Sequence, residues 1–544
     1  MISFKTLFFF VFITMSSSTV VHGKKTSRPN IILILADDMG YSDIGCFGSE
    51  IETPNLDKLA SSGLRMSQFY NNARCCPTRA SLLTGLYPHM AGIGHMAGDA
   101  LNELGYLGDL NDQCVTIAQV LKPAGYANYA VGKWHVSANT KDNGPKNNWP
   151  IQRGFDKYFG IIPGAANYFD PKGLKNGNEP VKVGKDFYTT DAFSDTAATY
   201  IQQHTAHNKQ NPFFMYVAYN APHWPLQAKE KGIQKYIDKY SIGWDKLREE
   251  RYSKQLKTGL LPASAKLNPR DAEVPAWDDI PEPEKKIWIK RMAVYAAQVD
   301  CLDQGVGRII QALKKNNVYD NTLIIFLSDN GGCAEFISRD DKTINALGTK
   351  DSWESYRINW ANASNTPFKL YKHWVHEGGI SAPCVISWPG MISNKGGIVN
   401  TPAHVIDLLP TFINLSGATY PLTFNGHNIA PLPGRSLVSI IKGENKPAER
   451  PIFWEHEANR AVRLGKWKLV SKGTNIKPYT GPWELYDIST DRSETNDLSK
   501  AQPAKVKELE AMWNKWATEN QVFPLNGLKG GERAKASGTK VIED

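Results

Sequence analysis

The chain has 544 residues, of which 41% are hydrophobic and 22% are charged, and its formal net charge is +9 at pH 7. This length allows two domains, one of them large, and the ordinary apolar content with a mean hydropathy of −0.40 is typical of a soluble globular protein. The positive charge suits anionic substrates, but the lysines are scattered and form no basic stripe with an aromatic platform, so we exclude nucleic acid as a partner.

The first 23 residues have the pattern of a secretory signal peptide. Lys5 precedes an apolar run at residues 7–15, and small residues follow it. The run is too short and too poorly flanked for a membrane-spanning helix, and no cysteine stands where a lipoprotein anchor would need one. We therefore expect an exported protein, periplasmic or secreted, without a membrane anchor.

After the signal, short apolar runs alternate with helical patterns. The runs are brief and continuous, as in strands that are buried on both faces, and they lie at residues 31–35, 126–131, 213–219 and 322–327. The helical patterns lie at residues 56–64, 115–122, 190–204 and 284–316. This alternation predicts an α/β domain with a large, mostly parallel sheet sandwiched by helices.

Polar residues follow directly after each predicted strand. They are Asp37 and Asp38, Lys133 and His135, His223, and Asp329 and Asn330. The carboxyl ends of parallel strands share one edge of the sheet, where ligands bind in open α/β folds, so we expect these clusters to converge. The carboxylate and amide oxygens among them are the set that calcium prefers, although each pair alone is more typical of a helix cap or a tight turn.

Residues 71–85 read as a loop that leads into a short helix. Pro77 suits the first helical position. The free N–H groups and partial positive charge of a helix N-terminus favour an anion or a nucleophile at Cys75 and Cys76, and Arg79 points at the same place from one turn on. The alternative is a buried cysteine pair beside a Pro-capped helix.

The remaining segments outline the domain organisation. Residues 139–190 and 225–285 show little periodicity and read as long insertions that either shape a substrate mouth or only decorate the surface. Short β-like runs at 451–455, 460–464, 467–472 and 483–488, with a helix at 502–519, predict a small antiparallel sheet with one packed helix. We divide the chain into a catalytic domain at 24–430, a C-terminal subdomain at 431–524 and a polar tail at 525–544.

The run Cys75-x-Pro77-x-Arg79, followed by Leu83-Thr84-Gly85, resembles the signature of the type I, formylglycine-dependent sulfatase family, arylsulfatase-like members of the alkaline phosphatase superfamily. Further blocks resemble the family in the same order, at residues 37–45, 53–57, 132–135, 221–225, 365–379 and 483–487. The chain departs from the family pattern in four places: Thr78 replaces the usual serine, Val136-Ser137 stands where Leu-Gly is common, Lys369-Leu370 stands for Arg-Gly, and Ser381 stands for arginine.

The resemblance implies a fold, a modification and a metal ion. The fold would be alkaline phosphatase-like, and a formylglycine-generating enzyme would oxidise Cys75 to formylglycine, leaving six of the seven cysteines. The hydrated aldehyde would be the nucleophile, because a serine lacks the second hydroxyl needed to expel sulfate. A calcium ion would be held by Asp37, Asp38, Asp329, Asn330 and residue 75.

The same resemblance assigns roles to the other polar residues. His223 would protonate the departing oxygen and His135 would accept a proton from the second hydroxyl. Lys133 and Lys372 would hold the sulfate oxygens as point charges, and Arg79 would steady the formylglycine hydrate and the carboxylates.

The expected function is hydrolysis of sulfate monoesters, either aryl sulfates or, in our preference, a sulfated sugar from a polysaccharide. A first alternative is a phosphate or phosphonate monoester hydrolase of the same superfamily. A second alternative is a catalytically silent protein that binds sulfated glycans.

Overall fold

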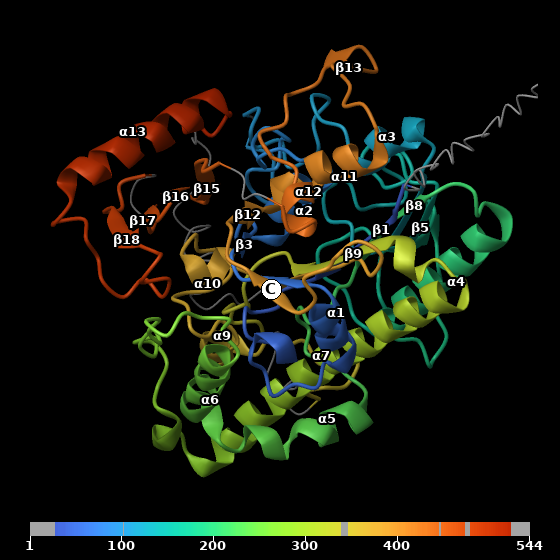
Figure 1. Ribbon diagram of the computed structural model, residues 1–544. Helices are drawn as coiled ribbons and strands as arrows, with labels where there is room; N and C mark the ends of the chain where they lie inside the picture. The colour runs from blue at the N-terminus through green and yellow to red at the C-terminus, as the bar shows by residue number, and fades with distance from the viewer. Residues whose placement is uncertain (1–27, 102, 339–345, 445–447, 474–478, 524–544) are drawn as a thin grey trace, which may run out of the picture.

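The structure is a computed structural model that describes residues 28–523, apart from residues 102, 339–345, 445–447 and 474–478. The predicted signal peptide and polar tail lie outside the described residues. A sheet of ten strands forms the centre of the molecule (Figure 1). In spatial order the strands are β11 (Gly397–Val399), β2 (Leu64–Met66), β10 (Cys384–Ser387), β9 (Thr322–Ser328), β1 (Asn30–Ala36), β8 (Phe213–Ala218), β4 (Ala127–Gly132), β5 (Lys157–Ile161), β6 (Leu174–Asn176) and β7 (Glu179–Pro180).

The middle of this sheet is parallel. Strand β1 pairs in parallel with β9 on one side and with β8 on the other, and β4 and β5 continue the parallel run beyond β8. Strand β10 is antiparallel to both of its neighbours, as are the pairings of β6. All seven residues of β1 are buried, which explains why its sequence is a continuous apolar run.

Helices cover both faces of the sheet. Alternate residues of β1 point to opposite sides and are apolar on both, so each face needs a covering layer. Ile32 and Ile34 pack into one apolar core, and Ile31, Leu33 and Leu35 into another. Below the sheet in Figure 1 lie α1 (Pro54–Ser62), α4 (Thr189–His207), α5 (Glu230–Tyr236) and α7 (Glu282–Lys315). Above it lie α2 (Cys75–Thr84), α3 (Ile117–Leu121), α11 (Leu408–Ser416) and α12 (Val438–Ile441). This architecture confirms the predicted fold class.

The C-terminal part of the chain forms a second, smaller layer, at the left of Figure 1. Its antiparallel sheet has the strands β15 (Ile452–His456), β16 (Asn459–Leu464), β17 (Trp467–Ser471) and β18 (Glu484–Asp487). Helix α13 (Pro503–Glu519) packs on it through Leu509, Trp513 and Trp516. Shorter elements complete the described chain: β3 (Phe69–Tyr70), α6 (Gly243–Lys257), α9 (Arg357–Ser364), α10 (Glu377–Ile380), β12 (Ala403–His404), β13 (Thr423–Phe424) and β14 (His427–Asn428).

Two expectations differ from the structure. Helix α2 begins at Cys75, two residues before Pro77, so this proline is not the first helical residue. The segments of little periodicity that read as long insertions contain the strands β5 to β7 and the helices α5 and α6. Helix α6 escaped notice because polar residues form part of its buried face: Arg251 pairs with Asp43 at 2.6 Å, and Gln255 donates to the Phe47 carbonyl at 3.0 Å.

Within residues 28–523, leaving out the gaps given above, every helix is too short or too polar to cross a lipid bilayer. All seven cysteines lie in the described part of the chain, and all of them are unpaired.

Candidate active site

The polar residues that follow the central strands meet at one edge of the sheet. Ala36 at the end of β1 is aligned with Ser328 at the end of β9, and Gly132 of β4 is aligned with Ala218 of β8. Because these strands are parallel and in register, the residues that follow them are brought together. Nine of the ten predicted site residues are buried, with exposures between 0% and 5%: Asp37, Asp38, Cys75, Arg79, Lys133, His223, Asp329, Asn330 and Lys372. His135 joins them from the loop after β4 and is partly buried.

Carboxylate and amide oxygens form the floor of this site. The backbone N–H of Asp38 donates to Asp329 Oδ1 at 3.1 Å, and Asn330 Nδ2 donates to Asp38 Oδ1 at 2.7 Å. Asp37, Asp38 and His223 each place a donor atom within 4.8 Å of the other two. The backbone of Asp38 has φ 65°, in the left-handed region, so its position is held against local strain.

The oxygen cluster is deeply buried, and two of its oxygens have no hydrogen-bond donor among the described residues. Burial, and then the Asp37 carboxylate, raise the pKa of Asp329 to about 8, and burial also raises the pKa of Asp37. Asp37 Oδ1 and Asn330 Oδ1 are buried and accept no hydrogen bond from the described residues. Hard oxygen ligands, two of them without a hydrogen-bond partner among the described residues, fit a divalent cation such as calcium.

Arg79 contacts residues from three different segments of the cluster. It reaches Asp329 Oδ2 through Nε at 3.1 Å and through Nη2 at 2.8 Å. Its Nη1 donates to the Lys133 carbonyl at 2.9 Å, and Nη2 lies 3.5 Å from Asp37 Oδ1. The planar guanidinium therefore fixes segments that follow three different strands.

Two lysines flank the carboxylates. Lys133 Nζ lies 2.6 Å from Asp37 Oδ2, and Lys372 Nζ lies 2.9 Å from Asp38 Oδ2. Burial alone would lower the pKa of Lys372, but Asp38, Cys333 and Glu335 together outweigh it, so the pKa rises well above its ordinary value. Burial raises the pKa of Asp38, but Lys372 and His223 outweigh it and lower that pKa overall.

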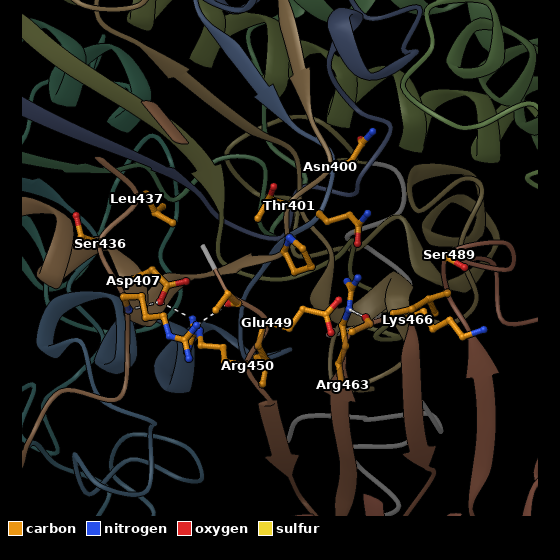
Figure 2. Close-up of a pocket in the computed structure, with 17 residues that line it drawn as sticks. Asn400, Thr401, Asp407, Ser436, Leu437, Glu449, Arg450, Arg463, Lys466 and Ser489 are labelled. Atoms are coloured by element: carbon orange, nitrogen blue, oxygen red, sulfur yellow. Dashed lines mark hydrogen bonds and ion pairs between the residues drawn. The ribbon is translucent and has the colours of Figure 1, made fainter. Parts of the chain in front are cut away.

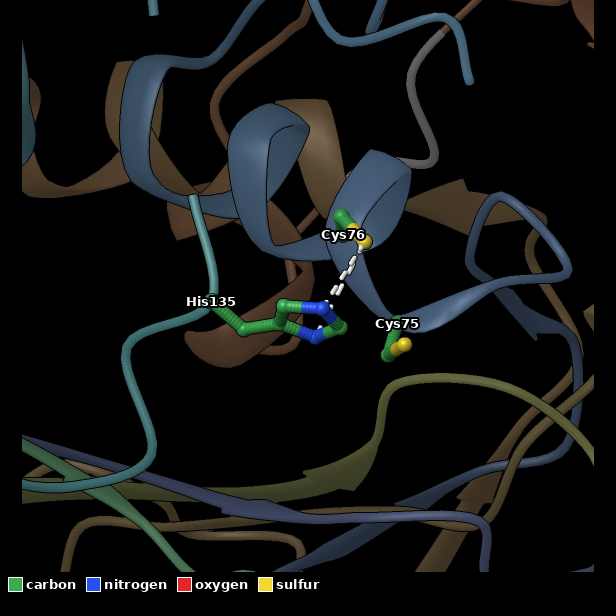
Figure 3. A group of neighbouring side chains, drawn as sticks. All are labelled: Cys75, Cys76 and His135. Atoms are coloured by element: carbon green, nitrogen blue, oxygen red, sulfur yellow. Dashed lines mark hydrogen bonds between the residues drawn. The ribbon is translucent and has the colours of Figure 1, made fainter. Parts of the chain in front are cut away.

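Cys75 is the first residue of α2 and is 2% exposed. Figure 3 shows that Cys76 points toward His135, while Cys75 lies at the start of the helix below it. Cys76 Sγ lies 3.4 Å from His135 Nε2, and the three donor atoms are within 4.8 Å of one another. The Cys76 thiol, and then Lys133 and His135, lower the pKa of Cys75 well below that of a free thiol. Burial raises the pKa of Cys76.

The two histidines are uncharged at neutral pH, because burial lowers the pKa of His135 and of His223 to about 4. His223 Nδ1 lies 2.6 Å from the Trp224 carbonyl, which can only accept, so Nδ1 carries the proton. The other nitrogen, Nε2, is then free to exchange a proton, and it lies 3.5 Å from Asp38 Oδ2.

The segment 139–190 supports both histidines. Gly164 lies so close to His135 that a side chain there would meet the imidazole carbon at 2.4 Å. The hydroxyl of Tyr168 lies within hydrogen-bond distance of the carbonyls of Asn220 and His223, at 2.7 and 2.8 Å, and can donate to either. Of the two open readings of this segment, the structure therefore favours the one in which it shapes the site.

Sequence reasoning missed Glu335 and Arg74. Glu335 Oε1 lies 2.9 Å from Arg74 Nη1, and Glu335 Oε2 lies 3.5 Å from Lys372 Nζ and 3.0 Å from Trp224 Nε1. Lys372 and Arg74 outweigh burial and hold the pKa of Glu335 far below its ordinary range. The available signal was the position of Glu335, five residues after Asn330 in a loop that leaves a strand end.

The turn between β15 and β16 also reaches the rim of the site. Glu457 and Ala458 form this turn with φ of 49° and 66°, a left-handed conformation that favours asparagine and glycine. The Glu457 carboxylate lies 2.9 Å from His95 Nε2 and 3.0 Å from His373 Nδ1. The backbone N–H of His373 donates to the Ala73 carbonyl at 2.7 Å. These contacts hold the strained turn in place.

His373, His456 and Glu457 offer donor atoms within 4.8 Å of one another, a spacing that a metal ion could use. Only one ring nitrogen of His373, Nε2, has a hydrogen-bond partner among the described residues. Asn459 Oδ1 accepts from the N–H of Gly473 at 2.8 Å, so its amide nitrogen faces His373 Nε2 at 3.2 Å. Since that nitrogen only donates, Nε2 accepts and Nδ1 carries the proton. His373 Nδ1, both ring nitrogens of His456 and Glu457 Oε2 are buried and make no hydrogen bond within the described residues.

A separate cavity of about 330 Å³ lies between the large domain and the C-terminal sheet (Figure 2). Arg450 is paired with Asp407 on one side of it, and Arg463 and Lys466 lie on the other. The predicted site residues do not line this cavity.

Comparison with known proteins gives the family. The sequence profile described as Sulfatase matches residues 29–418, and the profile described as N-sulphoglucosamine sulphohydrolase, C-terminal, matches residues 368–521. The chain is similar to an uncharacterized sulfatase of Schizosaccharomyces pombe, with 34% identity over 543 residues that cover 92% of this chain and 95% of the relative. It is also similar to an arylsulfatase of Klebsiella aerogenes, with 33% identity over 438 residues that cover 77% and 93%.

A solved structure, that of Ps i-CgsB, aligns with a TM-score of 0.67 and 30% identity, covering 94% of this chain and 97% of the other. The profile covers well over half of the chain, and the buried cluster of acidic, basic and imidazole side chains lies inside the matched region. The chain therefore belongs to the sulfatase family and is a sulfatase, an enzyme that hydrolyses sulfate esters.

Proposed function

We propose that residue 75, converted to formylglycine, is the nucleophile of this sulfatase and that a calcium ion lies against Asp37, Asp38, Asp329 and Asn330. The observation that carries the proposal is the group of buried oxygen ligands beside the start of α2, two of which have no hydrogen-bond partner among the described residues, with the pKa of Asp329 raised to about 8. A divalent cation would satisfy these oxygens. When bound, the two groups supply a positive charge and two hydroxyls on one carbon.

The protein's own residues bind the substrate and move its protons. Lys133 and Lys372 are buried cations, and we assign them to the sulfate oxygens. His223 Nε2 is the nitrogen free to exchange a proton, and we assign it to the oxygen of the departing alcohol. His135, next to the start of α2, would take a proton from residue 75. Arg79 keeps Asp329 oriented.

The substrate that we propose is a sulfated carbohydrate. The structure of Ps i-CgsB, which is 30% identical to this chain, has also been solved in complex with k-i-k-neocarrahexaose. Relatives named N-acetylgalactosamine-6-sulfatase, such as that of Mus musculus at 28% identity, cover 85% of this chain. These likenesses support a sugar as the alcohol that leaves, and an aryl sulfate would serve as an assay substrate.

Export of the protein is part of the same proposal. Residues 1–23 have the pattern of a signal peptide, and a sulfated polysaccharide would be met outside the cell. Fractionation of cells that express the full chain tests this point: the mature protein should be found outside the cytoplasm and should lack its first residues by mass spectrometry.

The deciding experiment is a screen of defined sulfated mono- and oligosaccharides that measures free sulfate. The protein is produced together with a formylglycine-generating enzyme, and the peptide that contains residue 75 is examined by mass spectrometry. We expect the mass of formylglycine at residue 75, sulfate release, and its loss in the Cys75→Ala variant. Full turnover by Cys75→Ala would overturn the assignment of the nucleophile.

The two alternatives give different outcomes in this experiment. A phosphate monoester hydrolase would turn over 4-nitrophenyl phosphate faster than 4-nitrophenyl sulfate. A silent glycan-binding protein would keep an intact thiol at residue 75 and release no sulfate, even with the maturation enzyme present.

A further inference from the structure

The residues next to the sulfate-binding groups become more exposed toward one side of the site. Lys372, Asp38 and His223 have side chains that are 2–5% exposed, whereas Arg74 and Glu335 are 13% and 15% exposed. Arg74 directly precedes Cys75 in the chain, so it is a neighbour of the proposed nucleophile, and its side chain is the more exposed of the two. This gradient places Arg74 and Glu335 between the buried floor and solvent.

The carboxylate of Glu335 contacts three other side chains of the site. Its Oε1 lies 2.9 Å from Arg74 Nη1, and its Oε2 lies 3.0 Å from Trp224 Nε1 and 3.5 Å from Lys372 Nζ. Trp224 is partly buried, and its ring centroid lies 4.6 Å from that of His223. Because His223 is assigned to the departing oxygen, Trp224, Glu335 and Arg74 are next to the alcohol that leaves.

The side chains of Arg74, Glu335 and Trp224 together can bind hydroxyl groups. A guanidinium and a carboxylate 2.9 Å apart neutralise each other, so together they offer donors and acceptors without a net charge. Arg74 Nε is buried and donates to no acceptor within the part of the chain that the structure describes. A neighbouring indole ring adds an apolar face of the kind on which sugar rings lie.

We propose that Arg74, Glu335 and Trp224 form a subsite for the sugar ring that carries the scissile sulfate. In this subsite Arg74 donates to, and Glu335 accepts from, ring hydroxyls beside the sulfate ester. Trp224 lies against the ring. The inference rests on the proposed function, and it adds that specificity is for a neutral, hydroxylated ring and not for a second sulfate at this position.

The test compares substrates that differ only in those hydroxyls. The probes are galactose and N-acetylgalactosamine monosulfates, their deoxy analogues that lack the hydroxyl next to the sulfate, and 4-nitrophenyl sulfate, which has none. For the best sugar, we expect the wild-type kcat/KM to fall at least tenfold on deoxygenation. Equal kcat/KM for the sugar and its deoxy analogue would overturn the subsite.

Variants give an independent measurement. In Arg74→Met and in Glu335→Gln, the ratio of kcat/KM for the sugar to that for 4-nitrophenyl sulfate should fall at least tenfold. Arg308→Met is the matched control: this arginine is 35% exposed, pairs with Asp191 at 2.7 Å on α4, and should leave the ratio unchanged. A ratio that stays within twofold in both site variants would contradict the inference.

Binding separates this inference from the proposed chemistry. Calorimetry with the Cys75→Ala protein measures the affinity for each sugar sulfate without turnover. Weaker binding of the deoxy analogue, by about tenfold, supports the subsite even if formylglycine is not the nucleophile. Equal binding of the two sugars contradicts the subsite even if every ester is hydrolysed.

Discussion

Replacing Arg79 by lysine keeps a positive charge at the centre of the site but removes the planar fork. Arg79 donates two hydrogen bonds to Asp329 Oδ2, at 3.1 and 2.8 Å, and one to the Lys133 carbonyl at 2.9 Å. A single ammonium group can keep one of these contacts. The other two are charged hydrogen bonds in a fully buried place, each worth roughly 1.5–3 kcal/mol. We therefore expect Arg79→Lys to lower the free energy of unfolding by about 3–6 kcal/mol.

Differential scanning calorimetry in calcium buffer measures this loss. The sulfatase profile spans roughly 390 residues, and an unfolding entropy of about 2.1 cal/mol/K per residue converts the loss to a Tm decrease of about 4–7 °C. Arg65→Lys is the matched control, because Arg65 is partly buried and contacts two backbone carbonyls, at 3.2 and 3.4 Å. An Arg79→Lys decrease no larger than that of Arg65→Lys would refute the argument.

Three further outcomes follow from the buried charges. Removing divalent cations with a chelator should lower the Tm and abolish turnover, calcium should restore both, and Asp37→Asn should no longer respond. Burial lowers the pKa of His404 to about 3, well below its unfolded value near 6.5, so the contribution of His404 to stability is present above pH 6.5 and is lost as the pH falls. In denaturant titrations between pH 6.5 and 5, the free energy of unfolding of His404→Gln should therefore fall by about 2 kcal/mol less than that of the wild type. Equal decreases in the two proteins would contradict this. Glu377 lies 3.0 Å from both Lys468 and Arg492, so Glu377→Gln should cost about 3–5 kcal/mol in the same titrations, and an unchanged midpoint would show that the pairs contribute nothing.

The centre of the fold was predictable because its residues have one environment. Every residue of β1 and β9 is buried, so their sequences are unbroken apolar runs that end where polar side chains begin. The parallel pairing of these strands then brings Asp37, Asp38, Asp329 and Asn330 to one edge, as expected from the order of elements alone. Whether these residues bind calcium stays a prediction.

The outer part of the site was not predictable in the same way. Arg74 and Glu335 meet only because the loops after β3 and β9 fold over the same edge, and no periodicity in either loop signals this contact. Likewise, α6 buries Arg251 and Gln255 against polar partners, so its inner face does not look apolar in sequence. Burial of paired polar groups depends on partners far along the chain, which local patterns do not contain.

During protein synthesis, Cys75 emerges from the ribosome long before the turn at Glu457. The two lie about 380 residues apart, and ribosomes add roughly 5–20 residues per second, so about 20–80 s pass between their emergence. In the folded protein Cys75 is 2% exposed, and the Glu457 turn then encloses the rim. If residue 75 is oxidised as proposed, the modifying enzyme would have to reach it before the C-terminal strands fold over the site.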